Sequence, residues 1–181
     1  MSRHVTLILG GARSGKSAHA QKLAEESRKA VLFVATAEAL DDEMAERIRR
    51  HQQERPAHWR TLEAPCAVAE QIRQTASAGE LILLDCVTLL ASNVIAPLPE
   101  PYNSGAAEAA LNAEIDALLA LMDASEHEWL IISNEVGLGL VPDSALGRVY
   151  RDALGRANQR LAAAADEVLF LAAGLPLRLK G

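Results

Sequence analysis

Residues 10–17 read Gly10-Gly11-Ala12-Arg13-Ser14-Gly15-Lys16-Ser17 and match the phosphate-binding pattern G-x-x-x-x-G-K-[ST]. The apolar run Val5–Leu9 precedes the motif and a helical pattern follows it, which is the context a P-loop requires. Backbone N–H groups of such a loop point at phosphate oxygens, and the positive end of the next helix adds to the attraction. We therefore predict a nucleotide-phosphate site here. Lys16 would be a solvent-side charge at the β- and γ-phosphates, and Ser17 a ligand of Mg²⁺.

Short apolar runs alternate with longer amphipathic segments on both sides of this motif. The expected strands are Val5–Leu9, Val31–Ala35, Leu81–Asp85, Trp129–Ser133 and Val168–Ala172, and the expected helices lie near 16–28, 41–54, 66–77, 107–122 and 145–165. The strands are continuously apolar, as strands covered on both faces should be. The pattern predicts one α/β domain over residues 1–181, a RecA-like P-loop NTPase fold with a mostly parallel sheet flanked by helices. The tail at 174–179 is a candidate short edge strand.

Composition excludes several classes of protein. The chain has 181 residues, 50% of them hydrophobic and 23% charged, which is typical of a globular domain and not of a disordered chain. A net charge of −6 disfavours a nucleic-acid partner, and the apolar runs are too short for membrane insertion. Cys66 and Cys86 are isolated, which disfavours a disulfide framework or a zinc site. We expect a cytoplasmic protein.

Two acidic residues are expected at the edge of the sheet where the P-loop lies. Asp85 ends an apolar strand and is the candidate metal-binding carboxylate; the alternative is that it caps the next helix. Glu135 follows another strand, and it either binds a substrate hydroxyl or is a plain loop carboxylate.

A histidine lies on the helix expected at 41–54. Leu40, Met44, Ile48 and His51 fall on one stripe of this helix, which is neither a clean core face nor a clean solvent face. The segment from 47 to 60 carries five arginines and one acid, Glu54. It is either a solvated face or a holder of a polyanionic ligand. On periodicity alone, a structural histidine is favoured at position 51. A neutral imidazole can attack phosphorus, however, and the P-loop and the nearby arginines make His51 a candidate nucleophile, with which His58 competes.

Five stretches of the chain carry a family resemblance. They are Gly10–Ser17, Leu40-Asp41-Asp42-Glu43-Met44, Arg55-Pro56-Ala57-His58-Trp59-Arg60-Thr61, Asn134-Glu135-Val136-Gly137, and Gly155–Val168. With these residues the sequence resembles the bifunctional adenosylcobinamide kinase/adenosylcobinamide-phosphate guanylyltransferase family of cobalamin biosynthesis. The resemblance implies that a nucleoside triphosphate phosphorylates adenosylcobinamide. GMP from GTP then passes, through a GMP-histidine, to adenosylcobinamide phosphate and yields adenosylcobinamide-GDP.

The resemblance also implies roles for individual residues. His51 would carry the GMP, and the protein would be a homotrimer that uses Mg²⁺ with GTP or ATP. The implied nucleotide contacts are Gly10, Gly11, Ala12, Arg13, Ser14, Gly15, Lys16, Ser17, Ala35, Thr36, Ala37, Gln52, Gln53, Glu54, Arg55, Glu63 and Asp85. Some relatives have two adjacent histidines where this chain has Arg50-His51, some have Ser at Ala37, and some have Glu at Asp85.

Two other functions compete with this reading. One is a small-molecule kinase that uses only the P-loop, with His51 structural. The other is a nucleotide-dependent switch or interaction protein. A GTPase switch would normally carry an N-K-x-D segment for reading guanine, and the sequence has none. Guanine specificity would then have to come from elsewhere, with residues 52–63 as the candidate segment.

Overall fold

A computed structural model describes residues 3–39, 42–53 and 55–181, and these residues form a sheet of seven strands. The strands are β1 (His4–Gly10), β2 (Val31–Ala35), β3 (Arg60–Glu63), β4 (Leu81–Asp85), β5 (Glu128–Ile132), β6 (Glu167–Ala172) and β7 (Leu175–Lys180), in the spatial order β3-β2-β4-β5-β1-β6-β7. Neighbours from β3 to β6 pair in parallel, and β7 pairs antiparallel with β6. The predicted α/β class and mostly parallel sheet are confirmed. So is the edge strand, which was expected in the tail at 174–179 and is found as β7 at its place.

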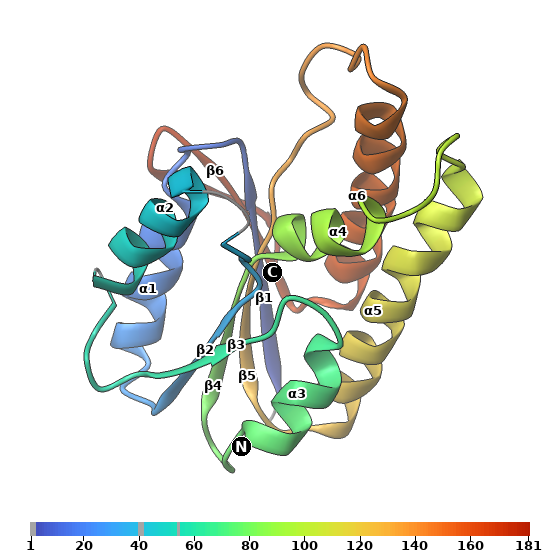
Figure 1. The fold of residues 1–181 in the computed structure, drawn as a ribbon. Coiled ribbons are helices and arrows are strands. Elements are labelled where there is room, and N and C mark those ends of the chain that lie inside the picture. Colours follow the sequence, from blue (N-terminus) through green and yellow to red (C-terminus); the bar gives the residue numbers. More distant parts are fainter. Residues whose placement is uncertain (1–2, 40–41, 54) are drawn as a thin grey trace.

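Helices cover both faces of the sheet (Figure 1). They are α1 (Lys16–Glu26), α2 (Asp42–Gln53), α3 (Val68–Thr75), α4 (Val87–Ile95), α5 (Ser104–Ala124) and α6 (Ala145–Ala164). In Figure 1, α1 and α2 lie on one side of the sheet and α3 to α6 on the other. Strand β5 lies between β1 and β4, an order of strands that the sequence did not predict. The carboxyl ends of these three parallel strands therefore meet at one edge of the sheet.

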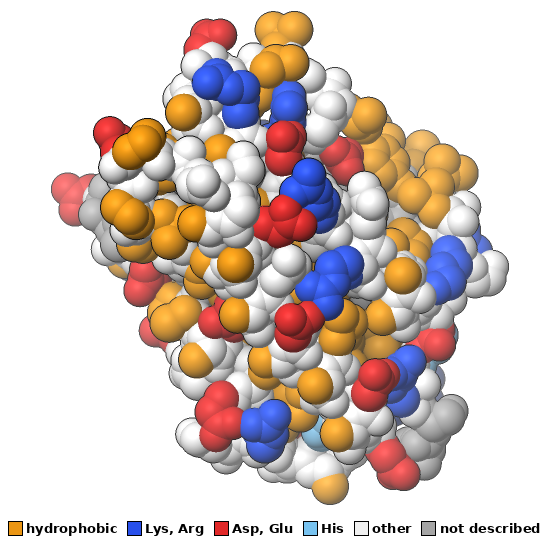
Figure 2. All heavy atoms as spheres, turned by 90° about the vertical axis from the view of Figure 1, so that its right-hand side faces the viewer, with side chains coloured by type: hydrophobic (Ala, Val, Ile, Leu, Met, Phe, Trp, Pro, Cys, Tyr) orange, Lys and Arg blue, Asp and Glu red, His pale blue; other side chains and the backbone are white. Residues whose placement is uncertain are grey.

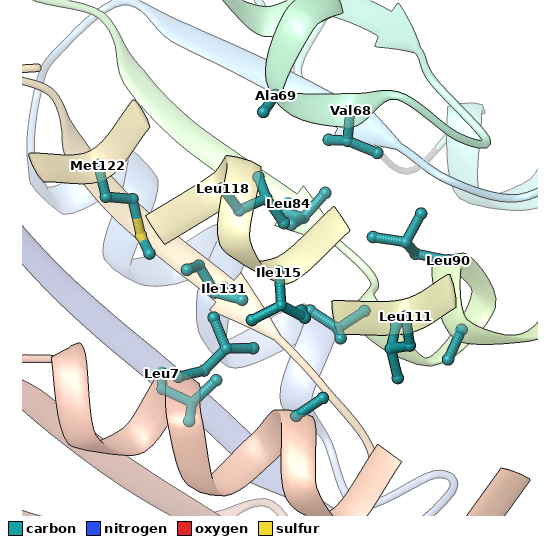
Figure 3. Close-up of a cluster of buried hydrophobic side chains, with 14 of the residues drawn as sticks. Leu7, Val68, Ala69, Leu84, Leu90, Leu111, Ile115, Leu118, Met122 and Ile131 are labelled. Atoms are coloured by element: carbon teal, nitrogen blue, oxygen red, sulfur yellow. The ribbon is translucent and has the colours of Figure 1, made fainter. Parts of the chain in front are cut away.

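Burial on both faces explains why the strands are continuously apolar. Along β4, Ile82 and Leu84 belong to the core cluster under α3 to α6, while Leu81 and Leu83 belong to the cluster that contains Ala20 and Ala24 of α1. Figure 3 shows the larger cluster, in which side chains from β1, β4 and β5 meet those of α5. All of these strand residues are buried, so the sheet forms a rigid base for the loops at its carboxyl edge.

Two elements were not predicted, and each lacks the usual signal. Strand β3 has four residues at the edge of the sheet, and most of them are exposed, so it shows no apolar run. Helix α4 is apolar nearly all round and directly follows β4, so its nine residues merge with the strand signal. Its spacing is nevertheless helical, because Val87, Leu90, Ala91 and Ile95 are the buried positions.

The outer face of α5 and α6 is a charged, solvated surface. Figure 2 shows basic and acidic side chains next to one another on this side of the molecule. Arg156 pairs with Glu108, and Arg160 pairs with Asp116, so both pairs join α6 to α5.

Among the described helices, none is both long enough and apolar enough to cross a bilayer.

Candidate nucleotide-binding and transfer site

The P-loop connects β1 to α1 with a backbone path that only glycine tolerates easily. Gly10 has φ +152° and Gly15 has φ +96°. A Cβ atom at position 10 would lie 2.5 Å from the carbonyl oxygen of Leu171 in β6. The loop is therefore packed against the neighbouring end of β6. A loop with this tight curl presents its backbone N–H groups to phosphate oxygens.

Lys16 is buried inside this loop. Its side chain extends back over the loop and its Nζ donates to the carbonyl oxygen of Gly11 at 2.7 Å. Only 7% of the residue is exposed, so the expectation of a solvent-side charge is wrong. The ammonium group is preorganised by the loop itself, and this arrangement suits a group that must meet phosphate charge without rearrangement.

The Ser14 hydroxyl oxygen is buried and has no hydrogen-bond partner within the described structure. Buried hydroxyls are nearly always hydrogen-bonded, so an orphan of this kind calls for an explanation. Ser14 lies in the middle of the phosphate-binding pattern, where a phosphate oxygen would accept a hydrogen bond from its hydroxyl group. The P-loop thus presents both a buried cation and an unsatisfied donor.

Ser17 and Asp85 form the candidate metal pair. Ser17 lies in the first turn of α1, and its hydroxyl donates to Oδ2 of Asp85, at the end of β4, over 3.0 Å. The N-cap of α4 is Cys86, with no side-chain capping bond, which favours the metal role of Asp85 over the capping role. In the described part of the chain no three His, Cys, Asp or Glu side chains gather as a metal cluster. Mg²⁺ suits this pair, since it commonly takes one or two protein oxygens and completes its shell with water and phosphate.

Thr36 holds the strand end that carries Asp85. It is fully buried, and its hydroxyl donates to the carbonyl oxygen of Cys86 at 2.7 Å and accepts from the Cys86 N–H at 2.9 Å. Its own N–H donates to the carbonyl oxygen of Asp85 at 3.2 Å. The hydroxyl is therefore engaged within the protein. The side chain acts on the site by fixing the backbone around Asp85, and the adjacent Ala35 and Ala37 flank it.

A pocket unites three of the predicted nucleotide contacts. The cavity has a volume of about 330 Å³. It is lined by Gln52 of α2, by Arg55 from the segment after α2 and by Glu63 of β3, together with Pro56, Ala57, Trp59 and Thr61. Gln52 Nε2 donates to Oε1 of Glu63 at 3.2 Å. In the sheet register, Glu63 and Asp85 both pair with Ala35, so the pocket and the metal pair are neighbours. Trp59 and Thr61 were not named as nucleotide contacts, although both lie in the segment 52–63 that was the candidate for guanine specificity.

Arg55 brings a positive charge to this region. Its Cζ atom lies 3.7 Å from the centroid of the Phe33 ring, and its Nε and Nη1 atoms are buried without a hydrogen-bond partner among the described residues. Burial lowers the pKa of Arg55 from its ordinary value, while the charges of Asp85 and Glu63 raise it in part. Two buried guanidinium donors are thus left for an anionic ligand.

For the predicted nucleophile, His51, the structure describes the backbone and not the side chain. His51 belongs by its backbone to α2, next to Gln52, but its side chain lies outside the described part of the structure, and so does the whole of Glu54. Gln53 is exposed at the end of α2. His58 is exposed and touches the edge of Trp59.

Comparison with known proteins agrees with this site. Residues 6–179 match the family described as "Cobinamide kinase / cobinamide phosphate guanyltransferase". The chain belongs to this family. The family's description names two activities, a kinase and a guanylyltransferase, so the protein is an enzyme, and the resemblance inferred from its motifs is confirmed.

Relatives in this family align over nearly their full length. The chain is 44% identical to the bifunctional adenosylcobalamin biosynthesis protein CobU of Escherichia coli, over 96% of this chain and 98% of that protein. It is 46% identical to the corresponding protein CobP of Pseudomonas aeruginosa, over 97% and 96%. A solved structure from Pyrococcus horikoshii has a TM-score of 0.56 at 8% identity, over 98% of this chain and 86% of that one, which shows a shared fold.

Proposed function

We propose that the protein phosphorylates adenosylcobinamide and then transfers GMP from GTP to adenosylcobinamide phosphate, through a covalent intermediate on His51. One observation carries the proposal. The Ser17–Asp85 pair of the P-loop lies beside the pocket of Gln52, Arg55 and Glu63, because Asp85 and Glu63 share a register partner in β2. A single nucleotide can therefore reach from the P-loop to the end of α2.

In the kinase step, the P-loop holds the β- and γ-phosphates. The hydroxyl oxygen of adenosylcobinamide attacks the γ-phosphorus, and the bond to the β,γ-bridging oxygen breaks. Lys16, fixed by the carbonyl of Gly11, faces the charge that develops on the phosphoryl oxygens. The Ser14 hydroxyl can donate to one of these oxygens. Bound Mg²⁺, held by Ser17 and Asp85, would supply charge neutralisation at the phosphates.

In the transfer step, the neutral imidazole of His51 attacks the α-phosphorus of GTP and pyrophosphate leaves. A phosphate oxygen of adenosylcobinamide phosphate then attacks the same phosphorus and releases His51. Two features support His51 in this role. It precedes Gln52, which lines the pocket, and Arg55 offers two buried donors to the departing pyrophosphate.

The pocket also supports guanine recognition. The Watson–Crick edge of guanine offers two N–H groups side by side, which a carboxylate such as Glu63 can accept together. Adenine presents an acceptor at one of these positions and would face the carboxylate with its lone pair. Trp59, which is buried against Phe33 at a ring-centroid distance of 6.5 Å, closes one side of the pocket.

The test is to incubate the protein with GTP and Mg²⁺, the GTP being labelled first at the α-phosphate and then at the γ-phosphate. The protein should retain the α label and not the γ label, in an acid-labile and base-stable phosphoramidate. The His51→Ala variant should lose the label, and His58→Ala, as the matched control, should keep it. Full labelling of His51→Ala would move the nucleophile elsewhere. No labelling of the wild-type protein, with kinase turnover retained, would leave only the kinase.

Assembly and location remain part of the proposal. We propose a homotrimer, in line with the resemblance, and a location in the cytoplasm, in line with the two isolated cysteines. Light scattering on the purified protein should give three times the chain mass, and a monomer mass would contradict the trimer.

A further inference from the structure

Glu135 lies against the P-loop, although it is three residues beyond the end of β5. Its backbone N–H donates to the carbonyl oxygen of Gly10 at 3.0 Å. In the register of β5, Ile132 pairs with Ile8 of β1 and with Asp85 of β4. Glu135 therefore stands between the phosphate-binding loop and the strand end that carries the metal pair.

The segment that carries Glu135 is held at its base by partly buried polar contacts. The N–H of Asn134 donates to the Thr88 hydroxyl at 2.8 Å, and Asn158 of α6 donates to the Asn134 carbonyl oxygen at 3.0 Å. The Tyr150 hydroxyl in turn donates to the Thr88 carbonyl oxygen at 2.9 Å. These bonds tie the segment to α4 and α6, so the position of Glu135 relative to the P-loop is well determined.

The direction of the Glu135 carboxylate is also set. The N–H of Gly137 donates to its Oε1 atom, and a Cβ atom at position 137 would lie 2.8 Å from that oxygen. A side chain at position 137 would therefore push the flexible end of Glu135 out of this position. No ion pair involving Glu135 is found among the described residues, so no described cation neutralises its charge. The carboxylate keeps lone pairs for a further donor.

An apolar loop follows directly. Leu138, Leu140 and Val141 are 80%, 95% and 64% exposed, which is unusual for three apolar residues so close together. Figure 1 shows this loop, between β5 and α6, rising above the carboxyl edge of the sheet. At its far end, Ser144, Leu146 and Gly147 line a cavity of about 250 Å³ between α6 and α4, with Tyr150.

The nucleotide sites occupy the ends of other strands, so the carboxyl end of β5 and the loop after it are left for the second substrate. The nucleoside pocket lies at β3 and α2, and the metal pair lies at the end of β4. The γ-phosphate end of a nucleotide in the P-loop therefore faces β5. A large corrin ring has extended apolar faces, and the exposed apolar loop offers a matching surface beside Glu135, a carboxylate that the nucleotide proposal does not use.

We propose that Glu135 is the catalytic residue that accepts the proton of the attacking hydroxyl in the kinase step, and that Leu138, Leu140 and Val141 contact the corrinoid substrate. The inference rests on the proposed function. As the hydroxyl oxygen bonds to the γ-phosphorus, its proton passes to the Glu135 carboxylate and then to water, while the nucleoside diphosphate leaves. The guanylylation of His51 involves neither the hydroxyl nor this carboxylate.

The Glu135→Gln variant tests the proposal because it keeps the size of the side chain and an acceptor for Gly137. Removal of a general base typically slows a reaction by about 10²- to 10⁴-fold. We expect kinase turnover to fall by at least about 10²-fold while α-phosphate labelling by GTP stays at the wild-type level. Glu126→Gln, an exposed carboxylate just before the other end of β5, is the matched control and should change neither readout.

Two further variants separate catalysis from folding. Gly137→Ala should displace the carboxylate and lower kinase turnover, again without loss of labelling. Leu140→Ser should raise the KM for cobinamide at least fivefold and leave the KM for the nucleotide unchanged. Full kinase turnover in Glu135→Gln, or equal loss of kinase and labelling, would overturn the role of Glu135. An unchanged cobinamide KM in Leu140→Ser would overturn the corrinoid surface. If the wild-type protein shows neither activity, the proposed function itself fails.

Discussion

Replacing Arg55 by methionine should weaken nucleotide binding without destabilising the fold. Nε and Nη1 of Arg55 are buried without a partner among the described residues. A buried polar group left unsatisfied costs about 1–3 kcal/mol. Arg55 is only half-buried, so we take the lower end, about 1 kcal/mol for each of the two donors. Methionine removes that penalty and is long enough to cover the same surface.

The losses on replacement partly offset this gain. The guanidinium lies 3.7 Å from the Phe33 ring centroid, a cation–π contact worth about 0.5–1 kcal/mol at a partly exposed site. A methionine sulfur beside the ring contributes about 0.3–1.5 kcal/mol in place of the cation–π contact. The attraction to Asp85 and Glu63 is also lost. The net change should lie between zero and about 1 kcal/mol in favour of the folded state, or a rise in Tm of up to about 3 °C.

The effect on GTP binding should be much larger. Hydrogen bonds to charged groups contribute about 1.5–3 kcal/mol, so the Kd for GTP should rise by about 10- to 150-fold. Isothermal titration with GTP and a thermal melt of the same protein measure both quantities. Arg49→Met is the matched control, since Arg49 lies exposed on α2 and pairs with Glu46. A fall in Tm beyond about 3 °C, or a Kd within twofold of wild type, would refute the assignment of Arg55 as a donor reserved for the nucleotide.

Three other predictions follow from the site. Lys16→Met should lower kinase turnover by about 10²- to 10³-fold in a protein whose circular dichroism is unchanged, and near-normal turnover would contradict the role of the P-loop. Asp85→Asn should shift the Mg²⁺ titration of both steps to higher concentration; an unchanged titration would point to a structural role. Burial, with the charge of Asp85, raises the pKa of Cys86 from 9.0 to about 11. The thiol ionises earlier in the unfolded chain, so the free energy of unfolding should fall by about 2 kcal/mol as the pH rises from 9 to 11. Cys86→Ala should lose that component in urea titrations, and an equal fall in both proteins would contradict it.

Local sequence was sufficient for the phosphate site and the sheet. The P-loop is a contiguous pattern whose glycines, lysine and serine act within a few residues of one another, so their spacing carries the geometry. The five central strands were readable because burial on both faces demands an unbroken apolar run. Asp85 followed from the same logic, since a carboxylate at the end of a buried strand must lie at the ligand edge of a parallel sheet.

Burial at the site was not readable in this way. Lys16 was expected to face solvent, yet the loop folds over it. The Nζ of Lys16 donates a hydrogen bond to the carbonyl oxygen of Gly11, and β6 packs against Gly10. Thr36 was implied as a nucleotide contact, and its hydroxyl proves to be engaged by the backbone of Cys86, fifty residues away. Strand β3 escaped detection because an exposed edge strand needs no apolar pattern.

The tertiary structure alone brings together the groups that come from distant parts of the chain. Gln52 and Glu63 meet in one pocket because β3 adds to the sheet beside β2, and this pairing also places Glu63 in line with Asp85. Glu135 reaches the P-loop because β5 inserts between β1 and β4. A contiguous motif owes its geometry to neighbouring φ and ψ angles. These contacts depend on the order of strands in the sheet, which is set by the packing of both faces and which no local pattern of residues encodes.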